Sequence, residues 1–238
     1  MNDKKIKEIL DSHALWLRTS DGDNPQGKRA DFTEADLSGI DFHGFFLGKI
    51  DLTGAIFNRT KLVGVDLSDA WLYAAVFDGA DFSYADLSGS VFSGSSMKCV
   101  NCTDTNLSNA DLSNTDLYGS HFVSTILDGA VFYDAILRNA HFREVAFSKA
   151  NFQKAHLCGA DLTGTNLPNA DFNGSDMQYS NLADANLEGA SFYDADLRSV
   201  NIRGANIRGA NFNKAIMWGS DLPRAIAKEE HISAVTND

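Results

Sequence analysis

An apolar residue recurs at every fifth position of this 238-residue chain, from Phe32 to Leu222, without an insertion or a deletion. Each of these residues is Leu, Phe, Ile or Met, apart from Cys102. An amphipathic helix requires a spacing of 3.6 residues and a half-buried strand a spacing of 2, so neither explains a period of five. We call each group of five residues a unit, and the apolar residue of each unit its centre. The pattern predicts a solenoid whose backbone repeats at every unit.

The positions around each centre indicate a very short strand followed by a turn. Two residues before the centre lies a small residue, usually Ala, and between them lies most often Asp or Asn. Side chains alternate along a strand, so the centre and the small residue face inward and the Asp or Asn faces outward. All glycines except Gly22, Gly27 and Gly48 lie two residues after a centre. That position suits the third residue of a type II turn, which has a positive φ.

We call the short strand of each unit a wall and its turn a corner. A second period of twenty residues sets the number of walls in each coil. Taking every fourth centre gives columns with long runs of one residue type, such as the phenylalanines from Phe132 to Phe212. Residues twenty apart would then stack at about 4.8 Å, the spacing of neighbouring strands. The sequence therefore predicts an all-β fold: a square parallel β-helix with four units per coil and about ten coils, spanning residues 30–225 as one domain.

Units such as "ADLSG" at 35–39 and "ANLEG" at 185–189 resemble the pentapeptide-repeat family, whose unit is written A(D/N)LXX. The resemblance implies a right-handed quadrilateral β-helix. The best-understood members of that family resemble B-DNA in shape and charge, bind DNA gyrase or related topoisomerases, and protect them against quinolones or other poisons. Others act in cyanobacterial differentiation or have no known role.

The two ends depart from the repeat. Residues 1–19 are expected to form a capping helix, because Ile6, Ile9, Leu10, His13 and Leu17 fall on one helical face. A linker of residues 20–29 follows. The first coil carries large residues (Ile40, Phe45 and Ile50) at the usual alanine position, which a helix lying over the coil would bury together with the sheet edge.

The C-terminal tail, residues 226–238, is a possible short helix, and Pro223 could start it over 223–235. Such a helix is too small to cover a whole coil. A homodimer contact at this end is therefore plausible, with candidate residues Ile216, Trp218 and Ile226.

Several classes of function are not favoured. The chain has neither the apolar run of a membrane span nor that of a signal peptide, so we expect a soluble, cytoplasmic protein. By the repeat frame, Cys102 points inward and Cys99 outward from a corner, so a redox or metal pair is not expected. His121 and His141 stack as a surface ladder without an evident third ligand. We find no catalytic constellation, and predict no enzyme activity, no metal and no cofactor.

Acidic side chains dominate the middle of the chain. Residues 66–134 hold ten acidic residues against one basic residue, Lys98. This segment spans roughly 17 Å, over which B-DNA carries about ten charges. The candidate DNA-mimic patch comprises Asp66, Asp69, Asp86 and Asp128. The alternative interpretation is that Asp is the usual outward residue of the repeat and serves solubility.

Aromatic residues form the second surface feature. Tyr73, Tyr133 and Tyr193 are each sixty residues apart, within the similar stretches "YAAVFDGADF", "YDAILRNAHF" and "YDADLRSVNI". This similarity suggests that a three-coil block was duplicated. Trp71, Val91 and Val131 replace the usual Asp or Asn on the same wall, where an apolar stripe could bind a partner or simply stack.

Two hypotheses of partner binding remain, beside that of a purely structural spacer. The first is a non-enzymatic scaffold that binds another protein, of unknown identity, through its walls. The alternative is a DNA mimic that binds DNA gyrase or another topoisomerase. Neither hypothesis includes direct binding of nucleic acid or of a membrane.

Overall fold

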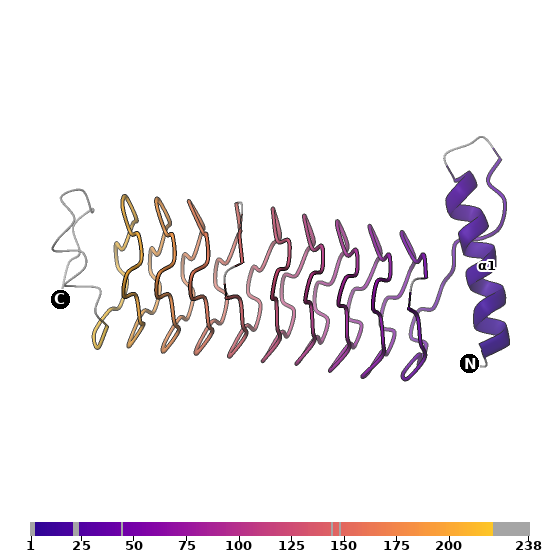
Figure 1. Ribbon diagram of the computed structural model, residues 1–238, viewed down its shortest axis with the longest axis horizontal. Coiled ribbons are helices and arrows are strands. Elements are labelled where there is room, and N and C mark those ends of the chain that lie inside the picture. The colour runs from indigo at the N-terminus through magenta and orange to yellow at the C-terminus, as the bar shows by residue number, and fades with distance from the viewer. Residues whose placement is uncertain (1–2, 21–23, 44, 144, 148, 221–238) are drawn as a thin grey trace.

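The computed structural model describes residues 3–20, 24–43, 45–143, 145–147 and 149–220. Figure 1 shows a straight stack of coils with one helix, α1 (Asp3–Thr19), lying across its N-terminal end. The expected tail helix 223–235, with Ile226, lies outside the described residues. Within the described ranges, no helix has the length and apolar character needed to cross a bilayer.

The coils repeat every twenty residues. Residues that precede a centre form parallel β-bridges with the residues twenty positions later, as in Asp51 with Trp71 and Trp71 with Val91. Four such bridge positions fall in each coil, which confirms the four-walled repeat. Each wall is so short that the described residues form isolated bridges and no extended strand.

Backbone hydrogen bonds join successive coils in a fixed pattern. The N–H of the centre Leu52 donates to the Trp71 carbonyl in the next coil at 2.8 Å, and the Trp71 N–H donates back to Ile50 at 2.9 Å. The Gly54 N–H also donates to the next coil, while the Ala55 N–H closes the turn onto Leu52 at 2.9 Å. The Asp51 N–H donates to the Ala30 carbonyl of the preceding coil at 3.5 Å, so four of the five N–H groups in the unit 51–55 are bonded.

The outward Asp or Asn supplies an acceptor for the fifth N–H. The Ser68 N–H donates to the Asp66 carboxylate at 2.9 Å, and the Ser88 N–H donates to Asp86 at 3.0 Å. This Asx turn requires a short side chain that carries an acceptor two residues before the N–H. The sequence pattern placed these residues outward but did not predict this bond. Asp and Asn are therefore favoured at this position for backbone hydrogen bonding as well as for exposure.

Every described residue that lies two positions after a centre has a positive φ. Gly129 has a φ of 70° and Ser124, at the preceding corner, a φ of 54°. In both turns the fourth residue donates to the carbonyl of the first, as in a type II turn. The left-handed conformation is thus a property of the corner, and many non-glycine residues, including Tyr179, adopt it.

The interior consists of stacked columns. The rings of Phe152, Phe172 and Phe192 are fully buried, and neighbouring centroids lie 5.0 Å apart with nearly parallel planes. The inward assignment of the centres is confirmed. Cys102 is likewise buried, and burial raises the pKa of its thiol, whereas Cys99 is exposed at a corner.

Helix α1 packs its apolar face on the first coil. Ile6 and Leu10 are buried there, and His13 is buried with both ring nitrogens hydrogen-bonded. The Ala30 N–H donates to His13 Nδ1 at 3.1 Å, so Nε2 carries the proton and donates to the Gly48 carbonyl at 3.0 Å. This burial lowers the pKa of His13. The contact favours a neutral imidazole between α1 and the first coil.

Candidate functional site

The predicted aromatic stripe begins at an exposed pair. Trp71 and Tyr73 are 52% and 55% exposed. The Arg29 guanidinium lies over the Trp71 ring at 4.2 Å from its centroid, so one face of the indole is already covered. Val91 and Val131 are half-buried on the same wall.

Tyr133 and Tyr193 each contact a lysine of the next coil. Lys154 Nζ donates to the Tyr133 hydroxyl at 2.8 Å and lies 5.2 Å from the ring centroid. Lys214 Nζ lies 4.9 Å from the Tyr193 ring centroid. The hydrogen bonds to the tyrosines raise the pKa of both lysines. The two tyrosines therefore present matching Tyr–Lys pairs at equivalent places on the rod.

The wall that follows these tyrosines along the chain carries further exposed aromatic residues. Its outward residues are Asp116, Ile136, His156, Asp176, Asp196 and Ile216. Tyr133 and Tyr193 lie at one of its corners, and Tyr118, Tyr179 and Trp218 lie exposed at the other. We call this surface the tyrosine wall. Sequence reasoning missed its second corner because it followed the wall positions; comparing the residues just after each centre would have aligned Tyr118 with Trp218.

A shallow hollow on the tyrosine wall is lined by Lys98, Asp116, Tyr118, Ile136, Arg138 and His156. Lys98 forms an ion pair with Asp116 at 3.3 Å, and His156 Nε2 lies 3.6 Å from the Asp134 carboxylate. Arg138 is exposed beside them. The hollow combines apolar contact area with one guanidinium.

The predicted acidic patch includes side chains that the backbone uses. Asp66 and Asp86 are stacked neighbours on one wall, and each accepts from a backbone N–H of its own corner. Asp69 lies at a corner with a φ of 53°, and Asp128 is exposed at another. The structure therefore brings Asp66 and Asp86 together and gives both a structural role in addition to their charge.

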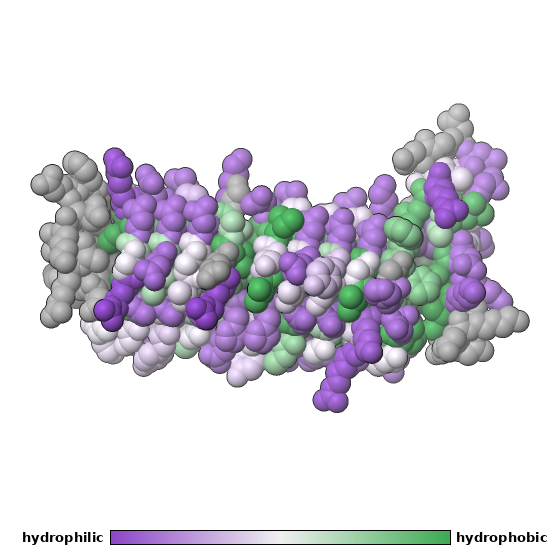
Figure 2. All heavy atoms as spheres, viewed as in Figure 1, coloured by the Kyte–Doolittle hydropathy of each residue, from purple (hydrophilic) through white to green (hydrophobic). Residues whose placement is uncertain are grey.

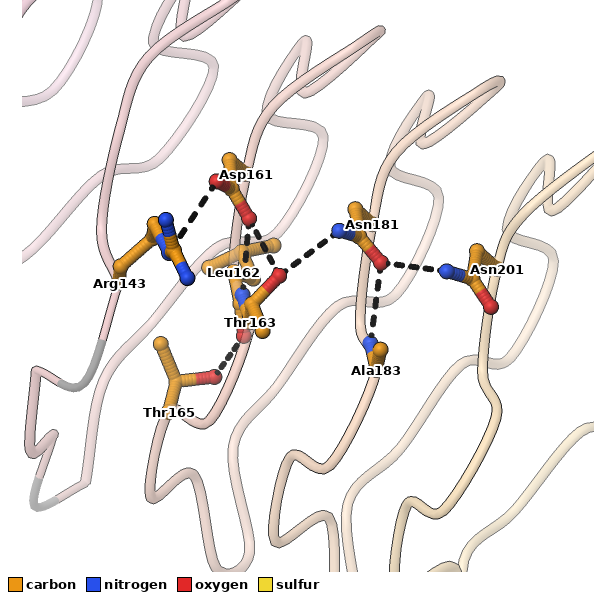
Figure 3. Close-up of polar contacts among 8 residues, drawn as sticks. All are labelled: Arg143, Asp161, Leu162, Thr163, Thr165, Asn181, Ala183 and Asn201. Atoms are coloured by element: carbon orange, nitrogen blue, oxygen red, sulfur yellow. Dashed lines mark hydrogen bonds and ion pairs between the residues drawn. The ribbon is translucent and has the colours of Figure 1, made fainter.

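The wall between the tyrosine wall and the wall of Asp66 and Asp86 carries a ladder of polar side chains (Figure 3). The Thr163 N–H donates to Asp161 at 3.1 Å, Asn181 Nδ2 to Thr163 Oγ1 at 2.7 Å, and Asn201 Nδ2 to Asn181 Oδ1 at 2.8 Å. Arg143 adds an ion pair with Asp161 at 3.7 Å. Because these groups already bond to one another, a partner that contacts this wall gains fewer new hydrogen bonds.

The same wall carries the predicted histidine ladder. The rings of His121 and His141 stack at 4.6 Å between centroids, with 5° between their planes. Burial, and then the neighbouring His141, lower the pKa of His121. Among the described residues no cluster of three metal-ligating side chains is found.

Apolar surface is unevenly distributed along the rod. On the face in Figure 2, hydrophobic residues gather where α1 meets the first coil and elsewhere lie mostly singly among polar ones. Leu15, Phe45 and Phe46 are exposed at that junction. At the other end, Ile216 and Trp218 are exposed, and the Arg198 guanidinium lies 5.3 Å from the Trp218 ring centroid.

The family model for pentapeptide repeats matches residues 30–69, 75–114, 105–144, 125–164, 140–178, 159–192 and 190–226 in eight copies. The chain belongs to the pentapeptide-repeat family. Proteins of this family form right-handed quadrilateral β-helices, in agreement with the four-walled coils described above. They are generally structural or binding proteins.

Several solved pentapeptide-repeat structures are similar to this chain, at low TM-scores. The HetL protein of the cyanobacterium Nostoc, involved in the regulation of heterocyst differentiation, is 24% identical over 84% of this chain and 94% of its own, with a TM-score of 0.33. The plasmid-mediated fluoroquinolone resistance protein QnrB1 is 15% identical over 84% and 91%, with a TM-score of 0.34. A protein of the Arabidopsis thaliana thylakoid lumen is 27% identical over 60% and 71%, with a TM-score of 0.30. No curated protein matches the chain significantly.

Proposed function

We propose that this pentapeptide-repeat protein is a cytoplasmic, non-enzymatic scaffold of about ten coils that binds another protein through the tyrosine wall. The observation that supports this most is the exposure of Tyr118, Tyr179, Tyr193 and Trp218 along both corners of one wall. Tyr, Trp and Arg are enriched where proteins bind one another, because they supply large contact areas together with a polar group. Trp71, Tyr73, Val91 and Val131, on the adjoining wall, would extend this surface.

The test uses two exposed tyrosines that lie at the corners of different walls. Tyr179 and Tyr84 are 67% and 66% exposed and both lie at positive-φ corners, with φ of 59° and 61°. Tyr84 does not border the tyrosine wall. A photo-crosslinking residue at position 179 should capture a partner protein in the source cell, and the same residue at position 84 should not. Capture at position 84 alone, or at neither position, would refute the proposal.

A second candidate is a DNA mimic that binds DNA gyrase or another topoisomerase. It is favoured by the acidic patch of Asp66, Asp69, Asp86 and Asp128 in the acidic middle of the rod. Against it, Arg198, Arg203 and Arg208 lie around one coil of the C-terminal half, and DNA has no positive counterpart. Inhibition of gyrase supercoiling by equimolar protein would favour this candidate.

We also propose a homodimer through the C-terminal end. Ile216 and Trp218 are exposed there, and Ile226 lies beyond the described residues. Sedimentation velocity should give a dimer for the wild type and a larger monomer fraction for Trp218→Ala. A monomer at all concentrations would exclude this assembly.

A further inference from the structure

Two thirty-residue segments of the rod resemble one another and are identical at 13 of their 30 positions. Residues 131–160 read "VFYDAILRNAHFREVAFSKANFQKAHLCGA" and residues 191–220 read "SFYDADLRSVNIRGANIRGANFNKAIMWGS". In both segments a lysine lies near the tyrosine ring, with Lys154 Nζ 5.2 Å from the Tyr133 centroid and Lys214 Nζ 4.9 Å from the Tyr193 centroid. Each copy also places an arginine at the far corner of the tyrosine wall, Arg138 in the first and Arg198 in the second. The two arginines can therefore be compared directly.

The second copy shows which group its arginine binds. Arg198 Nε donates to both oxygens of Asp196, at 2.8 and 2.9 Å, and its terminal NH₂ also donates to that carboxylate. This is the two-pronged geometry that guanidinium and carboxylate groups prefer. Arg198 is half-buried in this pair.

The first copy lacks this carboxylate. The position equivalent to Asp196 is Ile136, which is exposed, and Arg138 is exposed beside it. Within the part of the chain that the structure describes, no carboxylate forms an ion pair with Arg138.

The surroundings of Arg138 also differ from those of a solvated surface arginine. It lines the hollow with Ile136 and Tyr118, which offer apolar contact area. The two other basic groups of the hollow already have carboxylate neighbours: Lys98 has Asp116 and His156 has Asp134. Arg138 is thus the basic group of this hollow that is left to bind an external anion.

We propose that this hollow binds an aspartate or glutamate side chain of the partner protein, with the carboxylate on the Arg138 guanidinium and adjacent apolar groups on Ile136 and Tyr118. This inference rests on the proposed function of the wall. It names the charged residue that a partner must carry where it contacts the hollow. Asp196 in the second copy is the internal example of the bound carboxylate.

The experiment titrates the full chain with the peptide acetyl-Leu-Glu-Leu-amide and, separately, with its Gln counterpart, following the Ile136 methyl and Arg138 Nε–Hε signals by NMR. The Glu peptide should shift both signals saturably, and the Gln peptide should bind about tenfold more weakly. Arg138→Gln should abolish the preference for Glu. Ile136→Asp should also abolish it, because the new carboxylate would bind Arg138 as Asp196 binds Arg198.

Arg198→Gln is the matched control and should leave peptide binding unchanged, since Arg198 is already paired. Thermal unfolding of each variant reports whether its fold is retained; the Asp196–Arg198 pair indicates that Ile136→Asp is tolerated. Equal affinity for both peptides, no shift with either, or full binding by Ile136→Asp would overturn the inference. If position 179 still crosslinks a partner in Arg138→Gln at wild-type yield, the scaffold stands and the carboxylate site falls. If the Glu peptide binds but no partner is crosslinked, the carboxylate site stands and the proposed scaffold function falls.

Discussion

At the scale of single residues, the backbone conformation of a corner is the same whichever residue type occupies it. The corner backbone has a positive φ whether its residue is Gly129, Ser124 or Tyr179. Each non-glycine residue there costs about 1–2 kcal/mol relative to a right-handed conformation. The sequence pattern identified the corner from its glycines, but it could not show that residues such as serine and tyrosine adopt the same φ there, because those residue types uncommonly have a positive φ.

The corner conformation predicts unequal effects of valine at two neighbouring turns. Gly129→Val introduces a β-branched side chain at a φ of 70°, and its Cβ would lie 2.6 Å from Asn109 Oδ1. Ser124→Val replaces a residue that already bears the cost of its own positive φ. We expect Gly129→Val to lower the free energy of unfolding by about 1–2 kcal/mol more than Ser124→Val, measured by urea denaturation. Equal losses would show that the glycine corner is not strained by a side chain.

His13 predicts a pH dependence at the contact between α1 and the first coil. Its pKa is lowered from 6.5 in the fold, first by burial and also by Arg29, while the bond to Gly48 opposes this. The stabilisation that neutral His13 gives the folded state is therefore complete above about pH 6.5. It declines as the pH falls towards the pKa of His13 in the folded state, because the unfolded chain binds the proton more readily. Protonation also removes the acceptor of the Ala30 N–H.

The measurement is the hydrogen-exchange protection factor of the Ala30 amide, corrected for the intrinsic rate. It should fall as the pH is lowered from about 6.5 to about 5.5 in the wild type. His13→Gln should flatten this dependence. His121→Gln is the control, because His121 also has a lowered pKa but lies on a wall of the rod and not in α1, and should not change it. A flat profile in the wild type would contradict the assignment.

At the scale of one coil, the period of five and the columns of twenty were sufficient to predict the walls and the buried ring stack. Both follow from what every coil must do, which is to bury its centres on its neighbours. The Asx turns were not predicted, since the sequence shows only that Asp and Asn recur and not which N–H they accept from. The second corner of the tyrosine wall was missed because its aromatic residues recur at no short interval.

The ring stack predicts that a charge cannot be accommodated at its middle. Phe172 is fully buried between Phe152 and Phe192. Phe172→Asp would bury a carboxylate without a partner, which costs several kcal/mol and should cause local unfolding or insolubility. Phe172→Leu is the control, because leucine occupies many other centres. An unchanged melting temperature for Phe172→Asp would refute the inward assignment.

At the scale of the whole molecule, the acidic middle and the tyrosine wall offer competing explanations of how a partner is bound. Charge in the middle is partly a consequence of the repeat, because Asp66 and Asp86 accept backbone hydrogen bonds that asparagine can also accept. This makes the two explanations separable. Asparagine variants remove the charge and keep the acceptor, so their fold should persist.

Binding to the partner captured by crosslinking, measured at low and high salt, distinguishes the two. The variant Asp66→Asn, Asp86→Asn, Asp128→Asn should weaken binding at low salt, and less so at high salt, if the acidic middle imitates DNA, since salt screens interactions between exposed charges. The double variant Trp71→Ala, Tyr133→Ala should weaken binding at both salt concentrations if aromatic contacts dominate. We expect the second result, because those rings are positioned by Arg29 and Lys154 and are large enough to anchor a partner. Loss of binding in the asparagine variant alone, together with gyrase inhibition by the wild type, would instead establish the DNA-mimic function.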